Sequence, residues 1–193
     1  MTQQRPRHLA ISIRPADLPD LNACLMLDGS YTTDTVWQMY LDPGSGPEGI
    51  AVRFRAVRLP RSMRVRYPRD SDELIGNWQQ QEGFLVAVAG NSETGTERVL
   101  GYVDIHVQAW QKAGWVQNFV VDLGYRRRGV GTALFEAAAE WGRAEALQRL
   151  MFECPTKNGA AIEFFHARGA VFCGFNDRYY TNYDIALFFD YRL

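Results

Sequence analysis

The spacing of apolar residues along the chain predicts strands and helices in a recognisable order. Short apolar or alternating runs between turn residues predict strands at residues 9–14, 52–57, 84–89, 99–107, 115–121, 150–154 and 183–189. Apolar residues at helical spacing predict helices at residues 18–26, 70–81, 131–149 and 158–168. A strand meander followed by strand, helix, strand, helix and strand indicates a mixed sheet with helices on its faces.

One segment interrupts this pattern. Residues 28–50 contain the turn-forming runs DGS and DPGSGPEG, and they are predicted to be loop around one short element at residues 36–40. The chain has 193 residues and shows no internal repeat. That length suits one domain with a buried core, so we expect a single domain over residues 9–193 after a flexible N-terminus at residues 1–8.

Composition and charge limit the classes of function that this protein is expected to have. Hydrophobic residues make up 47% and charged residues 22%, as in an ordinary soluble protein, and the net charge of -1 gives no electrostatic reason to expect nucleic acid or an anionic membrane as partner. The three cysteines lack C-x-x-C spacing, which argues against a disulfide framework or a metal site. No signal peptide or membrane span is visible, so a cytoplasmic protein is expected.

The segment YRRRGVGTALF, from Tyr125 to Phe135, carries the clearest chemistry. It lies between a predicted strand and a predicted helix, so free backbone N–H groups and the positive end of the helix meet there and stabilise an anion. Gly129 and Gly131 let the backbone approach a phosphate, and three arginines add charge. The dinucleotide fingerprint fails because Leu134 stands where its third glycine belongs, and the P-loop fails because no lysine follows.

The remaining pattern, R-x-x-G-x-G, resembles the pyrophosphate loop of the GCN5-related N-acetyltransferase family, which binds acetyl-CoA. The family's downstream pattern N-x-x-A-x-x-F-Y-x-x-x-G-F is similar to NGAAIEFFHARGAVF, where Asn158, Ala161, Ile162, Phe164 and Gly169 are in register. The resemblance covers roughly residues 9–193. It implies an α/β (α+β) fold with a mostly antiparallel central sheet, helices on both faces, and a splayed wedge that holds acetyl-CoA.

The resemblance also implies where the cofactor binds. The backbone of the strand before the loop would pair with the pantetheine, the loop would hold the pyrophosphate, and Asn158 would face the thiol end. The strand residues are Phe119, Val120 and Val121, and the loop residues are Arg126, Arg127, Arg128, Gly129, Val130, Gly131 and Thr132. The acceptor amine would attack the thioester directly, so that the protein has to orient it and move two protons.

Both proton-handling positions depart from the family pattern. Many members carry glutamate about where this chain has Gln117, and tyrosine where it has Phe165. We therefore expect other residues to assist: Glu153 or Asp104 in removing the amine proton through water, and Tyr180 or Tyr183, about equally favoured, in protonating the thiolate. The residues expected to meet the acceptor are Tyr31, Asp104 and Gln117.

The acceptor class stays open. Residues 30–33 (SYTT) and 182–189 (NYDIALFF) look like the streptothricin acetyltransferase branch, which suggests a small amine similar to streptothricin, a polyamine or an aminoglycoside. A protein N-terminus or lysine is the alternative acceptor. Gln117 and Phe165 also motivate a different class, a non-catalytic acyl-CoA sensor. Arginines within residues 53–69 could suggest RNA binding, but a solvated strand face explains them better. The aromatic C-terminal strand could pair across a homodimer.

Overall fold

The structure, a computed structural model, describes residues 10–42, 49, 51–69, 74–76, 78, 82–91 and 96–193. The chain forms two compact units. The first contains residues 1–29, 69–150 and 192–193, and the second contains residues 30–68 and 151–191. The predicted single domain over residues 9–193 stays a prediction.

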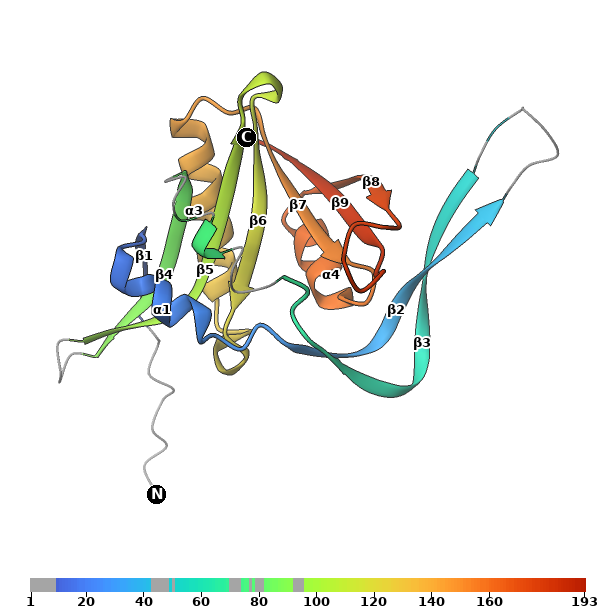
Figure 1. Cartoon of the computed structure of the whole chain (residues 1–193), viewed down its shortest axis with the longest axis horizontal. Coiled ribbons are helices and arrows are strands. Elements are labelled where there is room, and N and C mark those ends of the chain that lie inside the picture. The colour runs from blue at the N-terminus through green and yellow to red at the C-terminus, as the bar shows by residue number, and fades with distance from the viewer. Residues whose placement is uncertain are drawn as a thin grey trace. The chain divides into compact units, whose positions relative to one another are not determined.

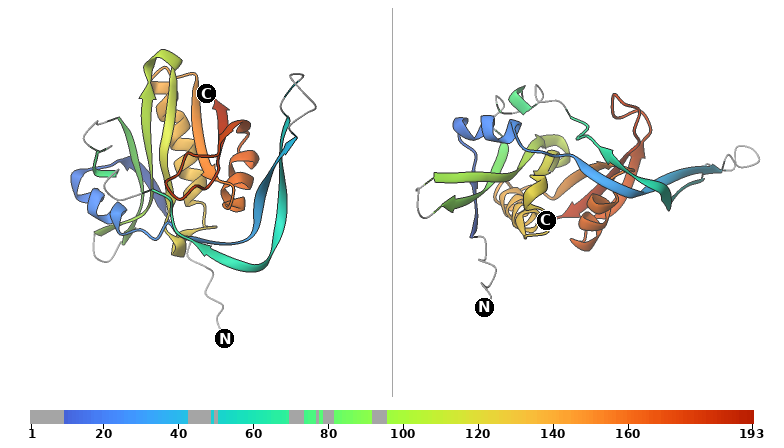
Figure 2. Two further views of the ribbon diagram at one scale, coloured as in Figure 1. Left: turned by 45° about the vertical axis from the view of Figure 1, so that its right-hand side comes forward. Right: turned by 90° about the horizontal axis from the view of Figure 1, so that it is seen from below.

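The first unit is a sheet with a helix on each face. Its strands are β1 (Ile11–Pro15), β4 (Gly83–Asn91), β5 (Thr96–Gln108) and β6 (Ala113–Val121), adjacent in this order and antiparallel throughout. The helices α1 (Leu18–Leu25) and α3 (Val130–Ala144) lie on opposite sides of this sheet (Figure 1, Figure 2). Two short 3-10 turns, η1 (Ala109–Gln111) and η2 (Leu123–Tyr125), flank β6.

The middle strands β4 and β5 are buried on both faces, over residues 85–88 and 99–105, as expected for a sheet with a helix on each side. Fully buried side chains form its core: Val86, Val88, Leu100, Val103, Ile105, Val130 and Leu134. Gly101 has to be glycine, because a Cβ there would lie 2.5 Å from the carbonyl oxygen of Val120 and 3.1 Å from Cδ1 of Leu134. The absence of a side chain at Gly101 therefore allows β6 and α3 to pack closely against β5.

The second unit contains a two-stranded ribbon, three further strands and a helix. Its elements are β2 (Tyr31–Asp42), β3 (Ala51–Val65), β7 (Arg149–Pro155), α4 (Gly159–Ala167), β8 (Val171–Asn176) and β9 (Ala186–Arg192). β2 and β3 pair antiparallel, and β9 lies between β7 and β8 in strand order (Figure 1). The ring of Phe54 on β3 packs at 5.9 Å from Phe172 and 5.3 Å from Phe175, which anchors the ribbon to β8. The mixed α/β fold with a mostly antiparallel sheet is confirmed.

The loop prediction for residues 28–50 was wrong, because residues 31–42 form β2. Its partner β3 is also much longer than the predicted strand at residues 52–57. The register passes from Thr35 opposite Arg58 to Thr33 opposite Met63, so that residues 59–62 form an irregular stretch that accommodates Pro60. Much of the ribbon is exposed, so its sequence lacks the alternation that reveals a half-buried strand. The predicted turn at residues 43–48 lies outside the described residues.

The C-terminal prediction was also partly wrong. The strand β8 was not expected, and the last strand begins at Ala186 rather than at residue 183. Tyr183 has a left-handed φ of 61° and donates its backbone N–H to the carbonyl oxygen of Tyr180, so it belongs to a turn. Helix α3 ends at Ala144, earlier than expected, and residues 146–147 turn back toward β7. The helix expected at residues 70–81 falls largely outside the described residues.

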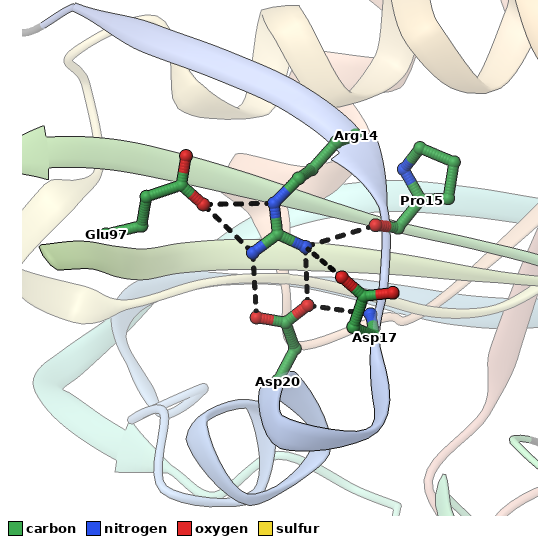
Figure 3. A network of polar contacts seen from close by, with 5 residues as sticks. All are labelled: Arg14, Pro15, Asp17, Asp20 and Glu97. Atoms are coloured by element: carbon green, nitrogen blue, oxygen red, sulfur yellow. Dashed lines mark hydrogen bonds and ion pairs between the residues drawn. The ribbon is translucent and has the colours of Figure 1, made fainter.

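A partly buried ion-pair network joins β1, α1 and β5 (Figure 3). The guanidinium of Arg14 donates to both oxygens of Asp20, at 2.6 and 3.0 Å, and to Glu97 at 3.0 Å. Burial raises the pKa of Asp20, but the hydrogen bonds from Arg14 and from the backbone of Asp17 outweigh it and hold the pKa below its usual range. The contacts with Asp20 and Glu97 raise the pKa of Arg14.

Replacing Arg14 with methionine should lower the free energy of unfolding by about 2 kcal/mol, because the buried carboxylate of Asp20 loses its charged donor. Urea titrations of both proteins give this difference. Since the folded-state pKa of Asp20 is depressed, the contribution is present above about pH 4 and disappears as the pH falls through the folded value. A difference that stays constant down to pH 2 would contradict this assignment. Arg143→Met, at an exposed position on α3, is the control.

Candidate functional site

The predicted anion-binding loop connects β6 to α3 in the first unit. Its turn is fixed by Asp122, whose side chain accepts a hydrogen bond from the backbone of Gly124 at 2.9 Å. Gly129 precedes the helix with a left-handed φ of 90°, and a Cβ placed there would meet nothing within 4 Å. The first N–H groups of a helix have no acceptor within the helix. Open space beside these donors therefore fits a phosphate group.

The three arginines of the loop have different roles. Arg126 is half-buried, and its guanidinium donates to the carbonyl oxygens of Val121, at 2.9 Å, and Asp28, at 3.3 Å. Burial lowers its pKa, while Asp28 and Asp122 act in the opposite direction. Arg126 thus fixes the loop backbone. Arg127 and Arg128 are exposed, and Arg128 lies over the ring of Tyr125 at 5.6 Å.

The strand before the loop contains a bulge at one predicted acceptor residue. Asp104 on β5 pairs with Asn118, but Ile105 pairs with Val116, so Gln117 is the extra residue of a β-bulge. Asp104 is buried and accepts a hydrogen bond from the Asn118 side chain at 3.0 Å. The structure therefore brings Asp104 and Gln117 to neighbouring positions of two paired strands.

Further along β6, the three residues expected to bind pantetheine directly precede the loop. Phe119, Val120 and Val121 pair with Val103, Tyr102 and Gly101 of β5. The splayed wedge that the family resemblance implies stays a prediction.

In the second unit, Tyr180 and Glu153 lie together. The Tyr180 hydroxyl is 3.4 Å from Oε1 of Glu153, and Tyr180 is buried. Tyr183, expected to be equally favoured, is 82% exposed. Of these two tyrosines, Tyr180 is therefore the one placed beside Glu153, a carboxylate that was expected to assist in proton removal.

A second polar cluster contains the predicted acceptor residue Tyr31. Its hydroxyl is buried and has no hydrogen-bond partner among the residues that the structure describes. Burial raises the pKa of the Tyr31 phenol, and the neighbouring Asp184 and Cys154 raise it further, so the group stays neutral. Asp184 is itself buried, forms an ion pair with Lys157 and accepts a hydrogen bond from Asn182 at 3.0 Å.

Lys157 was missed by the sequence reasoning, although one signal was present. The chain has only two lysines among its 21 basic residues, and Lys157 directly precedes the Asn158 motif. Asn158 caps α4, since its Oδ1 accepts a hydrogen bond from the backbone of Ala161 at 3.1 Å. The same unit explains Phe165: its ring packs 4.8 Å from Phe152 and 5.9 Å from Phe189. This position is dry aromatic core, unsuited to a proton donor.

Three further features to consider are a cysteine nucleophile, a metal site and a membrane-spanning helix. Burial raises the pKa of the Cys154 thiol, which makes it a poor nucleophile at neutral pH. Among the described residues, no three His, Cys, Asp or Glu side chains gather in a way that could hold a metal ion. No helix in the described ranges is long and apolar enough to span a membrane.

A mixed α/β fold with a loop between β6 and α3 whose free backbone donors suit an anion is typical of proteins that bind a phosphate-bearing ligand. The chain belongs to the Acetyltransferase (GNAT) family, which matches residues 55–170. It is therefore an N-acetyltransferase that uses acetyl-CoA, as the loop motif implied.

Individual proteins are similar over most of the chain. The streptothricin acetyltransferase of Streptomyces lavendulae is 27% identical over 174 residues, which cover 88% of this chain and 84% of that protein. The crystal structure of nourseothricin acetyltransferase is similar with a TM-score of 0.75 and 26% identity, covering 95% and 98% of the two chains. A Bacillus anthracis structure in complex with acetyl coenzyme A has a TM-score of 0.71 at 18% identity, covering 97% and 99%, and shows likeness of fold.

Proposed function

We propose that this N-acetyltransferase acetylates a small-molecule primary amine of the streptothricin type. The observation that carries this proposal is the similarity to the Streptomyces lavendulae streptothricin acetyltransferase along most of both chains. The chemistry of the described side chains supports it. A primary amine is cationic at neutral pH, and Glu153 and Asp104 offer carboxylates in half-buried or buried positions where charge is weakly screened.

The first unit would bind the donor. The backbone of Phe119, Val120 and Val121 would pair with the pantetheine, and the N–H groups of Val130, Gly131 and Thr132 would bind the pyrophosphate together with Arg127. Acetyl-CoA supplies the thioester carbonyl that the amine attacks. Asn158 is held by its capping bond, and its role at the thiol end of the donor stays a prediction.

Glu153 and Tyr180 would carry the protons. The cationic amine first loses a proton to solvent. Attack by the neutral amine then forms the N–C bond and breaks the C–S bond, and it leaves one excess proton on nitrogen and a need for one on sulfur. Glu153 would take the amine proton through water, and Tyr180 would donate its hydroxyl proton to the thiolate. Because Tyr180 and Glu153 lie 3.4 Å apart, Glu153 can return the proton to Tyr180, which completes the cycle.

The acceptor would be oriented by Tyr31, Asp104 and Gln117. Tyr31 has a neutral, buried hydroxyl, and an unsatisfied buried donor is destabilising, so a substrate acceptor atom would be its natural partner. Asp104 and Gln117 are adjacent on β5 and β6. The cytoplasmic location and the homodimer remain predictions.

Replacing Tyr180 with phenylalanine should lower kcat by about 100-fold or more, because the thiolate loses its proton donor. The Kd for acetyl-CoA should stay unchanged, since the proposed role of Tyr180 is to move a proton after the donor has bound. Tyr183→Phe is the matched control, and we expect it to be near wild type because Tyr183 is exposed. Steady-state CoA release measures both variants. Equal effects of the two substitutions would contradict the assignment to Tyr180.

The proposed function is tested by CoA release from acetyl-CoA against streptothricin, polyamines, aminoglycosides and peptides with free N-termini. Mass spectrometry then identifies the acetylated product. We expect streptothricin to be acetylated with the highest kcat/KM. Acetylation of the peptides alone would favour a protein acetyltransferase. Tight acetyl-CoA binding without turnover on any amine would favour the non-catalytic sensor.

A further inference from the structure

We propose that Arg98, which lies outside the loop motif, binds the 3′-phosphate of the CoA ribose together with Arg128. This inference rests on the use of acetyl-CoA and extends the phosphate site beyond the pyrophosphate. It makes Arg98 a specificity-determining residue that distinguishes CoA from 3′-dephospho-CoA.

The position of Arg98 follows from the pairing of β5 with the chain that enters the loop. Gly101 pairs with Val121, and the backbone N–H of Asp122 donates to the carbonyl oxygen of Leu100 at 2.9 Å. The first residues of β5 therefore run beside the start of the loop. The guanidinium carbon of Arg98 lies 5.1 Å from the ring centroid of Tyr125 in that segment.

Arg128 shares the same aromatic ring. Its guanidinium carbon lies 5.6 Å from the ring centroid of Tyr125, so that one tyrosine orients a cation from β5 and a cation from the loop. Both arginines are exposed, and Tyr125 is half-buried between the strand and the loop. The aromatic ring reduces the freedom of two long side chains before any ligand arrives.

Among the described residues, Arg98 and Arg128 differ from Arg14 and Arg126 in their polar partners. Within the described part of the chain, neither Arg98 nor Arg128 forms a hydrogen bond or an ion pair with another side chain. Arg14, by contrast, is bound to Asp20 and Glu97, and Arg126 is bound to backbone carbonyl oxygens. Two cations held near one ring, with no counter-charge among the residues that the structure describes, are suited to an anion that comes from solution.

The number of charges favours a phosphate other than the pyrophosphate. The first-turn N–H groups of α3 and the exposed Arg127 are available for the pyrophosphate within the motif itself. A phosphate monoester carries nearly two negative charges at neutral pH and three strong acceptor oxygens. Guanidinium groups match these oxygens with two parallel hydrogen bonds, which a lysine does not provide. Arg98 and Arg128 together balance one such group.

Isothermal titration calorimetry with CoA and 3′-dephospho-CoA tests the proposal. We expect the wild-type protein to bind CoA at least about 10-fold more tightly, with a preference that shrinks as salt screens the charges. Arg98→Ala should remove most of the preference for CoA, with Arg128 keeping the remainder, and should leave dephospho-CoA binding unchanged. Arg98→Lys should keep part of the preference. Arg143→Ala, an exposed arginine at the other end of α3, should keep all of it.

The outcomes separate this proposal from the proposed function. Equal affinity of the wild type for the two ligands, or an equal loss of both in Arg98→Ala, would overturn the role of Arg98 while acetyl-CoA binding stands. A wild-type protein that binds neither ligand would overturn both. Thermal melting without ligand checks that Arg98→Ala is folded, and its unchanged binding of dephospho-CoA gives the same check at the site itself.

Discussion

Gly129→Val should weaken acetyl-CoA binding by at least about 100-fold and abolish turnover at ordinary donor concentrations. Gly129 has a φ of 90°, a backbone conformation that a β-branched residue strongly disfavours. The strained residue would rotate out of this conformation and carry the first N–H groups of α3 with it. A Cβ would also enter the open space beside these donors, where no protein atom lies within 4 Å. The expected loss therefore combines misplaced donors with steric exclusion of the phosphate.

Calorimetric titration with acetyl-CoA measures this effect, and melting without ligand separates it from loss of fold. We expect destabilisation of only about 1–2 kcal/mol, because the strain is confined to one exposed residue. Gly124→Ala is a suitable control. Gly124 lies in the turn before the loop, and an added Cβ there would only approach the flexible side chain of Asp122 at 3.3 Å. If Gly129→Val bound acetyl-CoA like wild type, the loop would not hold the pyrophosphate.

Lys157→Met should lower the free energy of unfolding by about 3 kcal/mol, the second large effect. Asp184 is 7% exposed, and Lys157 is its cationic partner. Lys157 itself is partly exposed, but removing it leaves the buried carboxylate of Asp184 without its cation, which is destabilising. The exposure of Lys157 and the bond from Asn182 limit this loss, which is why we expect the lower end of the range for buried pairs. Acceptor KM should rise as well, because Asp184 neighbours the Tyr31 hydroxyl.

A double-mutant cycle in urea isolates the pair. Lys157→Met/Asp184→Asn should recover most of the lost stability, since no unpaired charge remains. The control is Lys112→Met, which removes the chain's other lysine from a hairpin turn where it forms no ion pair within the described residues. A double variant no more stable than Lys157→Met would show that the lysine acts by something other than neutralising Asp184.

The two predictions differ in whether the sequence alone could have suggested them. The glycine requirement at Gly129 could be inferred from the loop motif, because a phosphate loop before a helix is encoded within a few consecutive residues. The Lys157–Asp184 pair joins positions 27 residues apart. Nothing local in the sequence specifies which of the many acidic residues a lysine will meet.

Local sequence patterns likewise predicted some elements of the fold and missed others. The central strands and both later helices were predictable, because half-buried strands and amphipathic helices impose their periods on the sequence. Strand β2, most of β3 beyond the predicted residues 52–57, and β8 were not. Two-stranded pairing leaves much of each strand exposed, and it follows from contacts such as Phe54 with Phe175 and the bond between the Trp37 N–H and the Thr156 carbonyl oxygen. Long-range packing selects these strands, and local periodicity does not reveal them.

The sequence by itself determined the mixed α/β class, the phosphate loop and, through its motifs, the family. Each of these is encoded by residues close together in the chain. Only the tertiary structure placed Tyr180 beside Glu153 and Tyr183 in solvent, turned Arg126 inward, and brought Arg98 to Tyr125. These arrangements depend on strand register and on turns that reverse the chain. A shift of one residue in the register of a strand would turn its side chains to the opposite face of the sheet.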